Sequence, residues 1–83
     1  MSKTTVYSVF AMSADEKTTL FGYPHGTVFE ARAQSDARAI SLEYPETVVR
    51  VEKCDLVYCS ESGPRLEARN SETIAKYRGG RGA

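Results

Sequence analysis

The sequence predicts an α+β fold, in which one short helix packs on a mostly antiparallel sheet of three to five strands. Three observations indicate this class. Residues 4–12 are rich in β-branched and aromatic side chains, residues 35–44 carry an apolar stripe that ends at a proline, and residues 47–53 are again β-branched. With 83 residues the chain forms one small domain. We expect this domain to span residues 1–78 and to be followed by a flexible basic tail over residues 79–83.

The first third of the chain is predicted to contain two strands and two exposed connections. Thr4–Met12 is predicted as the first strand, and the polar segment Ser13–Thr19 as a solvated loop. Glycine and proline mark Leu20–Gly26 as a turn. Thr27–Ala33 alternates between apolar and polar or charged residues, which is typical of a half-buried strand.

A short helix is predicted to follow that second strand. Ser35 is a suitable N-cap because its hydroxyl can accept a hydrogen bond from the first free helix amides. Pro45 ends the helix, since the residue before a proline is pushed out of the α region. The apolar stripe consists of Ala37, Ile40 and Tyr44. Thr47–Lys53 is the third strand, and the short links favour a right-handed crossover that makes the second and third strands parallel.

The remainder of the chain is predicted to form a hairpin and a terminal helix. Leu56–Cys59 leaves two interpretations open, a tight turn into a fourth strand or a bulge. Ser60–Pro64 is the strongest turn signal, and Arg65–Arg69 alternates as expected for a charged edge strand. A short helix is expected over Glu72–Arg78, with Gly79 and the following glycine ending it.

Composition excludes several classes of protein. No apolar run approaches the ~20 residues that a membrane-spanning helix needs, and the N-terminal residues lack the apolar core of a signal peptide. We therefore expect a cytoplasmic protein, located in the host cytoplasm if a phage encodes it. In that compartment Cys54 and Cys59 are predicted to be reduced thiols. Their spacing matches neither a redox pair nor a zinc knuckle.

The sequence contains no recognisable catalytic constellation. Its one histidine, His25, lies in a Pro-His-Gly turn, whereas a general acid or base needs an orienting partner and a site that excludes water. No phosphate-binding glycine loop or dinucleotide fingerprint is present. We expect the protein to be no enzyme and to need no cofactor or metal.

Charge is distributed unevenly along a chain whose net charge is zero. Up to Pro64 there are six basic and nine acidic residues, a net charge of −3; from Arg65 onward there are five basic and two acidic residues, a net charge of +3. Residues 78–82 resemble a single Arg-Gly-Gly unit, and such segments can bind RNA by charge and stacking. A small RNA or single-stranded DNA binding protein that uses the basic C-terminal tail is therefore the alternative function.

Recognition of another macromolecule through surface side chains is the leading function. Tyrosine and arginine are enriched where proteins meet, and the chain has five tyrosines. The candidate contact residues are aromatic or turn residues and C-terminal cations: Phe21, Tyr23, His25, Arg65, Arg69, Lys76, Tyr77, Arg78 and Arg81. The protein is expected to act as a monomer or as a homodimer, the latter joined through an exposed sheet edge.

One stretch also carries a family resemblance. Between Thr27 and Val51 the chain has a predicted strand ending in Ala-x-Ser, a helix opening with Asp-Ala and a strand containing Val-Val-Arg-Val. The residues that carry this pattern are Phe29, Ala31, Ala33, Ser35, Ala37, Ile40, Val49, Arg50 and Val51. The pattern resembles small phage-encoded host-takeover proteins, namely a coliphage inhibitor of host RNA polymerase and several compact anti-CRISPR proteins.

The resemblance implies a function and a class of partner. It implies a non-enzymatic inhibitor that binds a bacterial nucleoprotein machine, such as a CRISPR effector complex or RNA polymerase, by stoichiometric protein contact. Many such inhibitors are strongly acidic and imitate DNA, whereas this chain is neutral. Contact with a bacterial host protein or nucleoprotein complex is therefore expected, rather than DNA mimicry.

Overall fold

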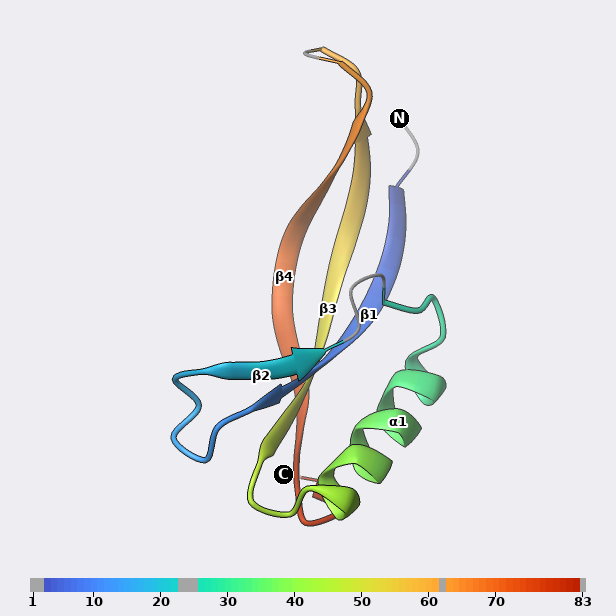
Figure 1. Cartoon of the computed structure of the whole chain (residues 1–83). Helices are drawn as coiled ribbons and strands as arrows, with labels where there is room; N and C mark the ends of the chain where they lie inside the picture. The colour runs from blue at the N-terminus through green and yellow to red at the C-terminus, as the bar shows by residue number, and fades with distance from the viewer. Residues whose placement is uncertain (1–2, 23–25, 62, 83) are drawn as a thin grey trace.

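In the part of the chain that the structure describes, one antiparallel sheet of five strands carries one helix on one face (Figure 1). This computed structural model describes residues 3–22, 26–61 and 63–82. Its elements are β1 (Lys3–Met12), β2 (Thr19–Gly22), α1 (Glu30–Glu43), β3 (Val48–Cys59), β4 (Arg65–Arg78) and β5 (Arg81–Gly82). The strands lie in the order β2-β1-β3-β4-β5. The predicted α+β class is confirmed.

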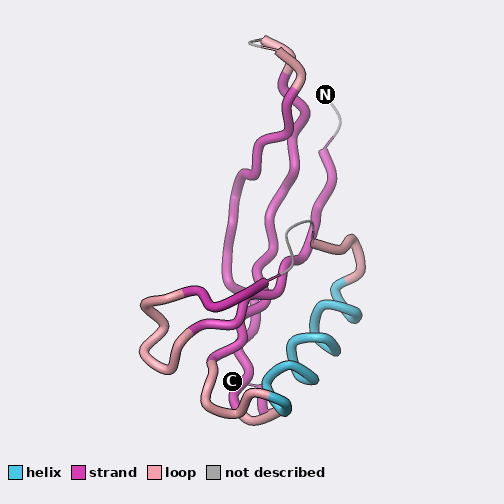
Figure 2. Tube along the Cα trace, viewed as in Figure 1, coloured by secondary structure: helices cyan, strands magenta, loops and turns pink. Residues whose placement is uncertain are grey.

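The central strand β3 pairs with β1 on one side and with β4 on the other along nearly its whole length. The distal halves of β3 and β4 continue past the helix as an arm, which we define as residues 53–59 and 65–71, and the first half of β1 stays paired with β3 up to Val57 (Figure 2). A register shift between Lys53 and Asp55 marks a bulge at the base of the arm. Of the two interpretations that the sequence left open here, the bulge is therefore correct.

The predicted second strand, Thr27–Ala33, is wrong. The helix α1 begins at Glu30, with Phe29 as its N-cap, so Ser35 lies inside the helix and does not cap it. The predicted parallel crossover is also wrong, because every strand pairing in the described sheet is antiparallel.

Alanine explains why this segment is helical. Ala33 and Ala37 are fully buried four residues apart, while Ala31 is exposed. This is the helical period, and alanine is the strongest helix former. The helix ends at Glu43, two residues before Pro45, as the sequence predicted.

Two further segments are strands where the sequence predicted other structures. Part of the predicted Leu20–Gly26 turn belongs to β2, which pairs with the end of β1. The predicted helix over Glu72–Arg78 is wrong because this segment is the second half of β4. Two helical turns are unstable alone, whereas pairing with β3 satisfies the backbone along the whole segment, and its β-branched and aromatic residues suit a strand.

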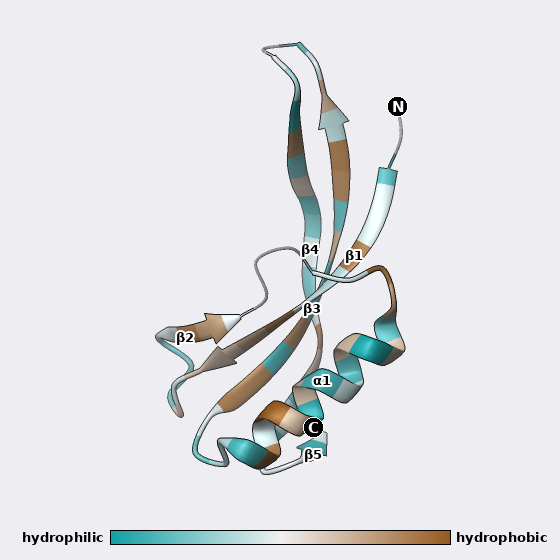
Figure 3. Ribbon diagram, turned by 45° about the vertical axis from the view of Figure 1, so that its right-hand side comes forward, coloured by the Kyte–Doolittle hydropathy of each residue, from teal (hydrophilic) through white to brown (hydrophobic). Residues whose placement is uncertain are grey.

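The core lies between α1 and the half of the sheet next to the helix. It consists of small and β-branched residues: Val9, Ala11, Ala33, Ala37, Val49 and Val51. Figure 3 shows that apolar residues also continue along β3 and β4 into the arm, where no described helix covers the sheet.

A glycine turn returns the chain to the edge of β4. Gly79 and Gly80 have φ values of 57° and 82°, in the left-handed region that favours glycine. The described part of the predicted tail then pairs as β5, with Arg81 opposite Arg78 and Gly82 opposite Tyr77.

Candidate functional site

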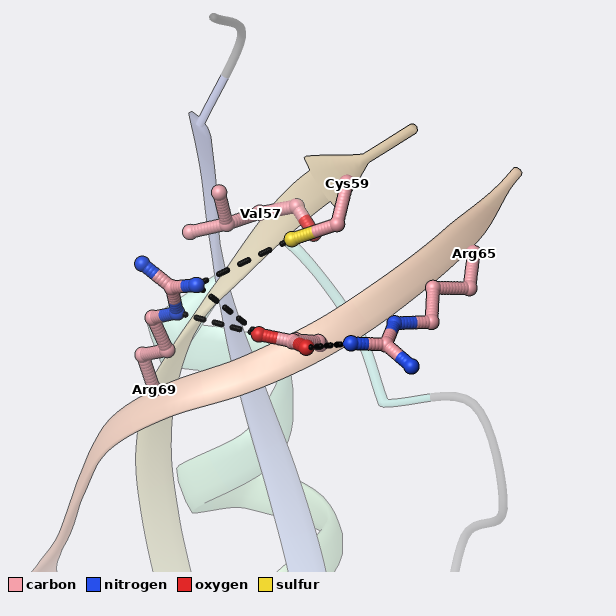
Figure 4. A network of polar contacts seen from close by, with 5 residues as sticks. Val57, Cys59, Arg65 and Arg69 are labelled. Atoms are coloured by element: carbon pink, nitrogen blue, oxygen red, sulfur yellow. Dashed lines mark hydrogen bonds and ion pairs between the residues drawn. The ribbon is translucent and has the colours of Figure 1, made fainter. Parts of the chain in front are cut away.

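The face of the arm on the helix side carries an ordered charged group, the arginine cluster, which consists of Arg65, Glu67 and Arg69 (Figure 4). The three residues alternate along β4, so their side chains point to the same face of the sheet. Arg65 Nη2 donates to Glu67 Oε1 at 2.6 Å, and Arg69 Nη2 donates to Glu67 Oε2 at 2.8 Å. Two predicted contact residues are thus held together by one carboxylate.

The cluster keeps a net positive charge and stays accessible. A hydrogen bond from Arg69, aided by Cys59 and by the charge of Arg65, lowers the pKa of the Glu67 carboxyl. Glu67 is therefore ionised at neutral pH and cancels one of the two positive charges. The side chains of Arg65 and Arg69 remain 56% and 52% exposed. Guanidinium groups fixed in this way are suited to bidentate contacts with carboxylates of another protein.

A second polar group on the arm ties β1 to the bulge of β4. The Asp55 carboxylate accepts hydrogen bonds from Thr5 Oγ1 at 3.0 Å and from Asn70 Nδ2 at 3.1 Å, and it lies 3.7 Å from Lys3 Nζ. The Asn70 bond is the main cause that lowers the pKa of Asp55. Asn70 has a φ of 57°, which asparagine tolerates better than most residues.

Two other predicted contact residues are paired with the loop between β1 and β2. Glu16 Oε1 lies 2.8 Å from Lys76 Nζ, and its other oxygen lies 3.6 Å from Arg78 Nη2. A hydrogen bond from Lys76 is the largest cause that lowers the pKa of Glu16. The acidic body and the basic C-terminal segment therefore meet in the fold and partly neutralise each other.

Phe21 lies on β2, where its ring is 42% exposed. It meets Tyr44 edge-to-face, with ring centroids 5.4 Å apart. A hollow of about 90 Å³ lies beside it, lined by Val9, Ala11, Phe21, Gly22 and Ile40. Phe21 thus packs on the end of α1 with one side and faces solvent with the other.

The remaining predicted contact residues occupy different environments. Tyr77 packs against the core, and its hydroxyl donates a hydrogen bond to the side-chain oxygen of Gln34. Arg81 is exposed on β5. Tyr23 and His25 lie outside the described residues.

Groups that could hold a metal ion were sought among the described residues. No set of three or more histidine, cysteine or acidic side chains is positioned for this role there. Cys54 and Cys59 are free and lie on opposite faces of β3, because their spacing is odd. Partial burial, the larger effect, and nearby carboxylates raise the pKa of Cys54, so its thiol stays protonated at neutral pH.

The sequence interpretation found the cations and missed the carboxylates that organise them. Glu67 stands two residues from each of two arginines, and in a strand this spacing places all three side chains on one face. That signal was present in the predicted edge strand Arg65–Arg69. The ion pair between Glu16 and Lys76 joins residues 60 positions apart, and no local sequence pattern predicts it.

No helix of the described residues is long and apolar enough to cross a membrane. Comparisons of the chain with protein-family models, with curated proteins and with solved structures find no significant match.

Proposed function

We propose that this chain is a non-enzymatic protein-binding inhibitor that acts on a bacterial nucleoprotein complex by stoichiometric contact. CRISPR effector complexes and RNA polymerase are the target classes that the resemblance described above implies. Of the three elements in that pattern, the fold has a helix, which begins earlier at Glu30, and the strand that contains Val49-Arg50-Val51, but not the strand Thr27–Ala33. The contact surface that we propose is the arginine cluster, together with the exposed side of Phe21.

The observation that carries this proposal is the arm. The radius of gyration is 13.9 Å, whereas a compact domain of this length has a radius of roughly 12 Å. The molecule measures 43 × 25 × 16 Å because β3 and β4, with the first half of β1 beside them, project beyond the helix (Figure 1). In a projecting hairpin most residues lie on the surface and do not contribute to the core. In a small domain such a projection is suited to contacting a larger partner.

Charge pairing favours a protein partner over the alternative of a nucleic acid. Tight binding to a phosphate backbone needs several free cations. Lys76 and Arg78 face Glu16, and the two arginines of the arm share Glu67. Alternating charges of both signs suit a protein surface that carries the complementary pattern.

The experiment adds the purified chain to two purified systems, transcription by bacterial RNA polymerase and target cleavage by a CRISPR effector. Inhibition of either system that saturates at a fixed molar ratio supports the proposal. A double variant, Arg65→Ala with Arg69→Ala, is expected to weaken inhibition by about 30-fold, the effect of removing one interface hot spot.

The matched control removes the same charge from another surface. Arg32→Ala with Arg38→Ala lies on the exposed side of α1 and is expected to inhibit like the unaltered chain. Absence of inhibition in both systems at tenfold molar excess, together with no bacterial protein recovered by affinity pull-down from lysate, contradicts the proposal.

A further inference from the structure

One face of the sheet packs on α1, and no described helix covers the other face. Next to the helix, the core residues Val9 and Val51 are paired in register and face α1. Residues that alternate with them point to the opposite face, which we call the open face. In the arm Leu56 and Ala68 are paired in register on this open face, two residues along β3 from the Val6–Cys54 pair, whereas Val57 lies on the helix side.

The open face is hollowed. A cavity of about 380 Å³ is lined by residues of β1, β3 and β4: Val6, Ser8, Phe10, Glu52, Cys54, Leu56, Leu66, Ala68 and Ser71. Most of the residues that line it are apolar. Leu66 forms the wall near the tip of the arm and is 64% exposed. A protruding leucine and an apolar hollow thus lie on one face of one molecule.

The elongated molecule exposes more surface than a compact monomer of the same mass. The chain exposes 5564 Å², whereas a compact monomer of 9.2 kDa exposes roughly 4,900 Å². The uncovered open face, with Leu66 and Tyr58 exposed, contributes to this excess of roughly 600 Å², and each partner in a stable protein interface buries ~800 Å². Zero net charge also means that two copies of the chain do not repel each other.

We propose that two copies of this chain pair through their open faces, with Leu66 of each copy entering the hollow of the other. A two-fold axis makes such an interface self-complementary, because the same protrusion and hollow occur on both sides. The arginine clusters lie on the opposite face of each arm and stay exposed in the pair. This inference goes beyond the proposed function and does not require it.

The face is a better surface for self-association than the sheet edge. Beyond β5 the free edge of β4 carries alternating charges, and its register with β3 shifts twice, after Val51 and after Lys53. Charges and bulges of this kind are devices that prevent edge pairing. At the β4 edge these features favour the face-joined homodimer over the edge-joined one that the sequence predicted.

Light scattering coupled to size-exclusion chromatography of the full chain tests the proposal. The expected mass is twice 9.2 kDa at high concentration, with dissociation on dilution. Leu66→Glu is expected to raise the dimer dissociation constant at least tenfold and leave the circular dichroism spectrum unchanged, because Leu66 is exposed in the single chain. Leu20→Glu makes the same change at a residue 54% exposed on β2 and is expected to keep the dimer.

A second measurement needs no substitution. Cys54 lines the hollow, while Cys59 points to the opposite face. Site-resolved alkylation with iodoacetamide is expected to slow at Cys54 as protein concentration rises, with an unchanged rate at Cys59. A monomer at all concentrations overturns the proposal. So does a dimer that Leu66→Glu and Leu20→Glu weaken equally, or one in which alkylation of Cys54 does not depend on concentration.

Discussion

The hydroxyl of Ser41 accepts a hydrogen bond from the backbone N–H of Gly80 at 2.8 Å and joins α1 to the turn between β4 and β5. The same hydroxyl donates to the carbonyl oxygen of Arg38 at 2.8 Å. Ser41 is fully buried. Residues 39 positions apart are thus connected by one side chain, and the C-terminal hairpin is held against the helix.

Ser41→Ala is expected to lower the free energy of unfolding by roughly 1–3 kcal/mol, because it leaves the Gly80 N–H without its partner. Urea denaturation monitored by circular dichroism measures the change. Ser35→Ala, at an exposed position of the same helix, is the matched control and is expected to change stability by less than about 0.5 kcal/mol. Equal effects of the two variants contradict a structural role for the Ser41 bond.

The two glycines of the C-terminal turn differ in their surroundings, although both have positive φ. A Cβ on Gly80 would overlap the side chain of Leu42, whereas a Cβ on Gly79 meets nothing within 4 Å. Gly79→Ala is expected to cost about 1 kcal/mol for its backbone conformation alone. Gly80→Ala is expected to lower the free energy of unfolding further, because the Leu42 side chain must move. Adding Leu42→Ala to that variant is expected to remove this extra loss of stability. Thermal unfolding of the three variants measures this coupling.

Burial at α1 separates two alanines that lie two residues apart. Ala33→Leu is expected to destabilise the fold by about 1–3 kcal/mol, since the added atoms have no space against the sheet. Ala31→Leu is expected to be nearly neutral because Ala31 is exposed. If both substitutions destabilise equally in urea, the two side chains share a buried face, as they do in a strand.

That contrast also explains where sequence interpretation succeeded and failed. Phe29, Ala31 and Ala33 alternate as in a strand, but Ala33 also begins a helical series through Ala37, and seven residues do not distinguish the two periods. The helix end was predictable because Pro45 acts locally. The second half of β4 was not, because its strand conformation depends on pairing with β3. The same limit applies to the contact residues, whose carboxylate partners are assembled by the fold.

Acid is expected to destabilise the protein through Asp15, whose pKa a hydrogen bond from Ser13 lowers, and through three carboxylates that are paired with cations or with other strands. Hydrogen bonds from Lys76, Asn70 and Arg69 lower the pKa values of Glu16, Asp55 and Glu67. A carboxyl with a lower pKa in the folded state stabilises the fold while it is ionised. This contribution is complete above the ordinary carboxyl pKa of about 4 and is lost as the pH falls through the lowered folded-state values.

The urea midpoint is therefore expected to stay level from about pH 7 to about pH 5 and to decrease below about pH 4. Asp55→Asn is expected to lower the midpoint at neutral pH and to reduce its decrease in acid. Glu46→Gln, in the exposed loop after α1, serves as the control for a lost carboxylate. A midpoint that rises on acidification contradicts this assignment of the four carboxylates.

The partial cover of the sheet by α1 has a consequence for motion within a single strand. Near Val49 and Val51, β3 is sealed by the helix on one side, and its amides open only when much of the fold opens. Toward Tyr58 the same strand is covered by no described helix, so its hydrogen bonds open from the hairpin tip in small steps. Amide hydrogen exchange should therefore slow progressively from Tyr58 to Val49, and dimer formation should flatten this gradient. A partner that binds the arm therefore contacts the part of the sheet that can change its conformation at the lowest cost in free energy.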